Sequence, residues 1–149
     1  MPDGVGSGTV LAFDFGLRRI GIALGETLLG QARPLMVIDA ESNDARFKVI
    51  EGLIADWQPA LLVVGLPCSV DGSEHEMTAR CRRFAHQLEG RFRLPVLFVD
   101  ERFSSSEADA RLAEDGLDWR ARKLQVDAVA AQIILQDYFD AYPKPILHP

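Results

Sequence analysis

Cysteine and long apolar runs are scarce in this chain of 149 residues, and each shortage excludes a class of protein. The two cysteines, Cys68 and Cys81, form no CxxC pair and have no histidine at zinc-ligand spacing. We therefore expect two reduced thiols rather than a structural zinc site. No apolar stretch is long enough to cross a bilayer, and residues 1–8 lack the charged-then-apolar order of a signal peptide. These shortages predict a cytoplasmic protein without a membrane partner.

The residues that are present give the composition of an ordinary globular protein, with 48% hydrophobic and 26% charged residues. The length predicts a single domain over 1–149, with irregular tails at 1–8 and 143–149. A net charge of −6 argues at first sight against a nucleic-acid partner. However, 13 of the 16 basic residues are arginines, many of them grouped, and the arginine fork suits phosphate recognition. A solvated helix face is the simpler explanation of any single group.

The first forty residues predict a meander of three antiparallel strands. Thr9–Asp14 is a β-branched and aromatic run, and a second apolar run at Ile20–Leu24 follows so closely that the two must form a hairpin. A third strand at about Leu35–Asp39 completes the meander.

The rest of the chain alternates between helices and buried strands. An apolar residue at every third or fourth position predicts a helix over Asn43–Trp57, which Pro59 ends. Two capping boxes, Ser73 with Glu76 and Ser104 with Glu107, open further helices. The predicted order after Pro59 is strand 60–65, helix 74–88, strand 95–99, helix 104–114 and helix 122–138. A meander followed by this alternation is typical of the ribonuclease H-like α/β fold, with a five-stranded mixed sheet flanked by helices.

Three acids stand where an open α/β sheet gathers its ligands, beyond the carboxyl ends of the strands. Asp14 lies near the end of the first strand, Glu101 follows the strand at 95–99, and Asp127 lies in the first turns of the last helix among apolar neighbours. Together they predict a hard-cation site, because Mg²⁺ prefers a few carboxylates plus water.

Each acid also has a simpler explanation that the sequence leaves open. Asp14 could hydrogen-bond the hairpin turn, and Glu101 could pair with an arginine. Asp127 could complement the positive end of its helix.

Four segments, FDFGLRRIGIA (13–23), VGLPCSVDGSE (64–74), VDERFSSSEA (99–108) and VDAVAAQIIL (126–135), resemble the YqgF-type family of pre-16S ribosomal RNA nucleases and Holliday junction resolvases. Their order and spacing agree with the family over nearly the whole chain. The resemblance implies a cytoplasmic bacterial nuclease that hydrolyses phosphodiester bonds in processing the 5′ end of precursor 16S rRNA. Branched DNA is the alternative substrate, and ribosomal particles are candidate partners of a monomer or homodimer.

The resemblance also implies roles for individual residues. Asp14, Glu101 and Asp127 match the family's acids and would be the catalytic residues that bind two Mg²⁺ or Mn²⁺ ions. Arg18, Arg19, Arg102 and Lys123 would bind the substrate near the scissile phosphate. Gln125 stands where the family often has a basic residue, which removes one phosphate contact.

Two other functions fit parts of the sequence. DFGLRRIGIAL also resembles the first phosphate loop of actin-like ATPases, although the second lobe that those enzymes need is lacking. A non-catalytic nucleic-acid-binding factor in ribosome assembly or transcription is the second alternative, and it would have no need of the three acids.

Overall fold

The computed structural model describes residues 8–67, 76–101 and 119–141, with only the backbone described for residue 101 and for 119–126. The predicted helix at 104–114 and the tails therefore lie outside the described residues. No helix within the described ranges is long and apolar enough to span a bilayer.

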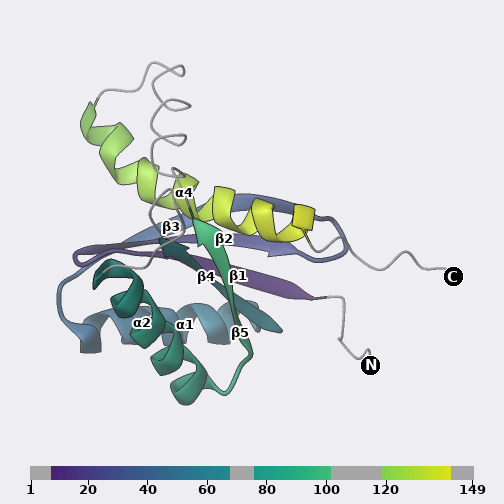
Figure 1. Ribbon diagram of the computed structural model, residues 1–149, viewed down its shortest axis with the longest axis horizontal. Helices are drawn as coiled ribbons and strands as arrows, with labels where there is room; N and C mark the ends of the chain where they lie inside the picture. Colours follow the sequence, from purple (N-terminus) through teal and green to yellow (C-terminus); the bar gives the residue numbers. More distant parts are fainter. Residues whose placement is uncertain (1–7, 68–75, 102–118, 142–149) are drawn as a thin grey trace, which may run out of the picture.

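A five-stranded mixed sheet forms the centre of the structure, with strand order β3-β2-β1-β4-β5 (Figure 1). β1 pairs antiparallel with β2, and β2 pairs antiparallel with β3. β4 then runs parallel to β1, and β5 runs parallel to β4. The predicted meander followed by parallel strands is thus confirmed. The strands span Thr9–Phe15 (β1), Arg19–Glu26 (β2), Gln31–Asp39 (β3), Leu61–Pro67 (β4) and Val96–Glu101 (β5).

Helices cover both faces of the sheet (Figure 1). α1 (Asn43–Trp57) and α2 (Glu76–Phe92) lie on one face, and α4 (Trp119–Ala141) crosses the other. α1 has the predicted bounds because both of its ends are fixed locally. The hydroxyl of Ser42 accepts a hydrogen bond from the Ala45 amide at 3.2 Å, and Gln58 adopts a left-handed conformation directly before Pro59.

Side chains of β1 alternate between the two faces and so enter two separate cores. Leu11 and Phe13 pack with the apolar faces of α1 and α2. Val10 and Ala12 pack instead against α4, beside Ala131 and other apolar residues of that helix. The face of each residue on β1 therefore follows from its position along the strand.

β3 begins at Gln31, four residues earlier than predicted, because Pro34 does not end it. A proline is tolerated there because β3 is an edge strand and its missing N–H breaks no ladder. The pairing shifts at this point: Ile22 is opposite Met36 and Ala23 is opposite Pro34, which leaves Leu35 as the extra residue of a bulge.

Two glutamines of α4 bind the backbone at the start of β3, at Gly30 just before the strand and at Ala32 within it. Gln136 accepts a hydrogen bond from the Ala32 amide and donates one to the Gly30 carbonyl, both at 3.0 Å. Gln132 donates to the Ala32 carbonyl at 3.0 Å. These bonds fix α4 along the sheet, and with it the position of every acid that the helix carries.

Candidate active site

The carboxyl ends of β1, β4 and β5 point to one end of the sheet, and two of the predicted acids lie there. Asp14 is the second-last residue of β1 and is paired with Gly21 of β2. Glu101 is the last residue of β5 and is paired with Pro67 of β4. Since β4 is the only strand between β1 and β5, the two acids lie at one end of the sheet with a single strand separating them.

Asp14 and the backbone of Asp127 both lie next to Gly21, on the α4 face of the sheet. Asp14 continues the alternation of Val10 and Ala12, which pack under α4. A Cβ atom added to Gly21 would lie 1.9 Å from the carbonyl oxygen of Asp127, so the helix backbone rests directly on this glycine. The structure thus brings residues 14 and 127 to adjoining positions.

The position of Asp127 in its helix differs from the prediction. α4 begins at Trp119, so Asp127 lies in the third turn and not in the first turns. Residues 119–125 contain no glycine or proline, and the helix continues through them. The effect of a helix dipole on a charge is confined to the terminal turn, so stabilisation by the helix N-terminus does not explain this acid.

The described partner of Asp127 is Arg19. The Nε atom of Arg19 donates to Oδ2 of Asp127 at 2.9 Å, and the two side chains are 25% and 22% exposed. Because the pair is partly buried, dissolved ions screen the attraction between its two charges less than they would on the surface. Arg19 therefore holds the carboxylate in one orientation at the end of the sheet where Asp14 lies.

Arg18, the neighbouring predicted substrate-binding residue, is held by other acids. Its Nε atom lies 3.1 Å from Oδ1 of Asp39, and its Nη1 atom lies 3.6 Å from Oε2 of Glu41. The hydrogen bond with Asp39, aided by the charges of Asp39 and Glu41, raises the pKa of Arg18 above its usual value. The guanidinium is exposed at the same end of the sheet as Asp14.

The structure describes the remaining predicted site residues only in part. Arg102 lies outside the described residues, as do the side chains of Glu101 and Lys123. Among the described residues, no group of three histidine, cysteine or acidic side chains is placed to hold a metal ion. The structure places Asp14 and the backbone of Asp127 against the same glycine, and the convergence of the three carboxylates stays a prediction.

The donor atoms at this end of the sheet fit a divalent cation. Asp14 and Asp127 offer carboxylate oxygens, which are the ligands that Mg²⁺ and Mn²⁺ prefer. One oxygen of Asp127 already faces a cationic group, the guanidinium of Arg19. A divalent cation there would be a second positive charge near the carboxylate of Asp127.

Sequence reasoning missed Gly21. The available signal was a glycine in the interior of an apolar strand, between Ile20 and Ile22. Such a glycine often marks the close approach of another backbone. Here the approaching backbone is that of Asp127, from more than a hundred residues away.

Two solved structures share the fold of this chain. The fowlpox virus resolvase in complex with Holliday junction DNA aligns with a TM-score of 0.60 at 9% identity, covering 91% of this chain and 99% of that one. Thermus thermophilus RuvC aligns with a TM-score of 0.50 at 13% identity, covering 91% and 97%. At such low identity the likeness concerns the fold alone, and the fold is RNase H-like.

Sequence comparison gives the particular family. Residues 8–141 match the model of the RuvX family, described as Holliday junction resolvase. A protein of Methylobacillus flagellatus, named "putative pre-16S rRNA nuclease", is 58% identical over 142 residues, which cover 94% of this chain and 97% of that protein. The chain belongs to the RuvX family, the YqgF-type family that its four segments resemble. It is a nuclease, a hydrolase of phosphodiester bonds.

Proposed function

We propose that the protein is a divalent-metal-dependent nuclease that processes the 5′ end of precursor 16S rRNA in the cytoplasm, bound to RNA or to ribosomal particles. The observation that carries the proposal is that Asp14 pairs with Gly21 while the backbone of Asp127 rests on the same glycine. The name of the relative from Methylobacillus flagellatus supports the choice of RNA.

Asp14, Asp127 and Glu101 are the proposed ligands of Mg²⁺ or Mn²⁺. The position of Glu101 supports its inclusion, because it follows Val99 in the alternation of β5 and Val99 packs on the α4 face. A divalent ion bound by these residues would lower the pKa of an attacking water and offset negative charge on the leaving oxygen of the phosphodiester.

The basic residues have two proposed tasks. Arg19 orients Asp127 through its Nε atom and leaves the second carboxylate oxygen, Oδ1, for the cation. Arg18, Arg102 and Lys123 bind phosphates of the strand near the scissile bond, where positive charge offsets the charge that builds up in the transition state.

The test is cleavage of precursor 16S rRNA by the purified protein with Mn²⁺, with Mg²⁺ and with EDTA. Asp14→Asn keeps the shape of the side chain and removes its charge, so we expect a folded protein whose cleavage rate falls at least a hundredfold, on the order of losing one transition-state contact. Asp127→Asn should behave alike. Asp56→Asn, an exposed acid of α1 away from this end of the sheet, is the matched control and should cleave as the parent does.

Branched DNA is the second candidate substrate. The family description, Holliday junction resolvase, and the fold shared with the fowlpox virus enzyme favour it. A synthetic four-way junction in the same assay separates the two substrates by rate. If the Asp14→Asn protein cuts as fast as the parent, the metal-nuclease mechanism is wrong. If the folded parent cuts neither substrate, the non-catalytic binding role becomes the better description.

A further inference from the structure

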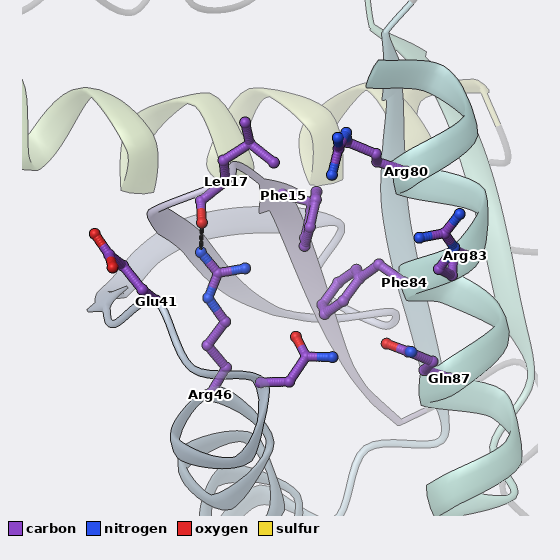
Figure 2. Close-up of a pocket in the computed structure, with 9 residues that line it drawn as sticks. Phe15, Leu17, Glu41, Arg46, Arg80, Arg83, Phe84 and Gln87 are labelled. Carbon is purple, nitrogen blue, oxygen red and sulfur yellow. Dashed lines mark hydrogen bonds between the residues drawn. The ribbon is translucent and has the colours of Figure 1, made fainter. Parts of the chain in front are cut away.

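A pocket of about 250 Å³ opens on the other face of the sheet, at the same end as the acids (Figure 2). It lies beside Phe15, which follows Asp14 on β1 and so belongs to the opposite face. Figure 2 shows residues of α2 on one side of the pocket and Arg46 of α1 on the other. The lining residues are Phe15, Leu17, Glu41, Asn43, Arg46, Arg80, Arg83, Phe84 and Gln87.

The pocket is positively charged on a protein of net charge −6. Three arginines and one glutamate line it, which leaves a formal charge of +2. The glutamate, Glu41, also lies 3.6 Å from the guanidinium of Arg18, so part of its charge is already offset. An anion is therefore the ligand that this pocket favours.

α2 supplies polar groups from one of its faces. Arg80, Arg83 and Gln87 are spaced by three and four residues and so lie along one side of the helix. Arg80 is paired with Glu76 at 3.0 Å. Arg83 and Gln87 make no side-chain hydrogen bond or ion pair with any other described residue, so their donors are available to a ligand.

Arg46 gives the strongest indication of an anion site because its side chain is buried, with a relative exposure of 3%. Its Nε atom donates to the Ala40 carbonyl at 2.6 Å and its Nη2 atom donates to the Leu17 carbonyl. These bonds use two of its five N–H donors. No described carboxylate lies within ion-pair distance of it. Burial lowers the pKa of Arg46, and the charge of Glu41 offsets only part of this effect. The guanidinium also lies over the ring of Phe15, 5.5 Å from its centroid.

We propose that this pocket binds a phosphate group of the nucleic-acid strand whose cleavage takes place on the α4 face. The inference deepens the proposed function and rests on it for the identity of the strand. A phosphate presents several acceptor oxygens, which suit the forks of Arg46 and Arg83 together with the Gln87 amide. The volume exceeds that of one phosphate, and the ring of Phe15 offers an apolar wall to the attached sugar. The strand then passes around the end of the sheet at residues 15–18.

The test measures binding without cleavage, in EDTA, by fluorescence anisotropy of a labelled single-stranded RNA. We expect Arg83→Gln to weaken binding about tenfold, the loss of one hydrogen bond to a charged group. The dependence of log K on log salt should become shallower by roughly one phosphate contact. Arg33→Gln removes the same charge from β3, outside this pocket, and should change neither the affinity beyond about twofold nor the slope.

Inorganic phosphate distinguishes a pocket that binds a phosphate of the nucleic-acid strand from one that binds free phosphate. At constant ionic strength it should raise the melting temperature of the parent and of Arg33→Gln, but not that of Arg83→Gln. If Arg83→Gln loses the phosphate response and binds RNA like the parent, the pocket takes free phosphate and the assignment to the strand is wrong. If Arg83→Gln equals the parent in both measurements, the pocket is not a phosphate site. Because no cleavage is involved, an inactive parent would overturn the proposed nuclease mechanism without affecting this result.

Discussion

Gly21 lies between the two acids of the α4 face, with Asp14 as its strand partner and the backbone of Asp127 against it. Gly21→Ala would place a methyl group 1.9 Å from the Asp127 carbonyl oxygen, and the contacting atom belongs to a helix backbone that cannot rotate away. We expect α4 to shift and the free energy of unfolding to fall by about 1–3 kcal/mol or more, the cost of overpacking a core. Urea unfolding measures the loss.

Gly52→Ala is the matched control for this substitution. Gly52 lies inside α1, and a Cβ atom added there would have open space around it. This variant should be more stable than the parent by roughly 0.5–1 kcal/mol, because glycine is a poor helix former. If Gly21→Ala is as stable as the parent and cleaves RNA equally well, the close approach of α4 to β2 is not what positions Asp127.

At the scale of whole elements, α4 depends on the bonds that Gln136 makes to the backbone of β3. Gln136→Ala removes the acceptor of the Ala32 amide and the donor to the Gly30 carbonyl. We expect the free energy of unfolding to fall by about 1–3 kcal/mol, since partly buried backbone groups lose their partners. Hydrogen exchange of the Ala32 amide should quicken as well.

Asp140→Ala separates this effect from the loss of a side-chain contact within α4. Asp140 accepts a hydrogen bond from Gln136 at 3.2 Å on the exposed side of the helix and touches no described atom of β3 by hydrogen bond. Its removal should change the stability by less than about 0.5 kcal/mol. Equal losses for the two variants would show that the bonds to β3 contribute nothing of their own.

The elements that sequence predicted best are those whose ends are fixed by neighbouring residues. Ser42 and Pro59 bracket α1, and the predicted bounds are confirmed. The strand predicted at Leu35–Asp39 is too short because β3 continues through Pro34, and only the strand order shows that β3 lies at the edge, where a proline is tolerated.

The sequence nominates acids for the candidate site, whereas the contacts around these acids can be read only from the structure. Asp14 and Asp127 could be nominated because carboxylates are rare in apolar strands and helices. The pairing of Arg19 with Asp127 joins residues 108 positions apart, and no local pattern predicts it. Arg46 precedes Phe47 in a helix, and its burial depends on how α1 packs against the turn at Leu17.

At the scale of the whole molecule, a divalent ion should stabilise the fold by mass action. An ion bound only by the folded state contributes RT ln(1 + [L]/Kd), or about 1.4 kcal/mol at tenfold excess over Kd. For a protein of this size that corresponds to a rise in melting temperature of roughly 3–6 °C. Differential scanning calorimetry with Mn²⁺ and with EDTA measures the shift.

Asp14→Asn should abolish most of this shift, because it removes one of the proposed ligands. The same variant in EDTA should melt at or above the temperature of the parent, since the proposed site then carries one negative charge fewer. A full Mn²⁺ shift in the Asp14→Asn protein would place the ion elsewhere on the molecule.

The hydrogen bonds from Gln132 and Gln136 to β3 also bear on aggregation of the protein. An open sheet edge is a template on which a strand of another chain can add and start an aggregate. Along β3 both backbone groups of Ala32 are already bonded to α4, Pro34 has no N–H to offer, and the bulge at Leu35 interrupts the regular edge. Chain-to-chain pairing is thereby blocked over this stretch. At high concentration, strand addition between copies should begin instead along β5, the other edge strand, where Leu97 is 41% exposed.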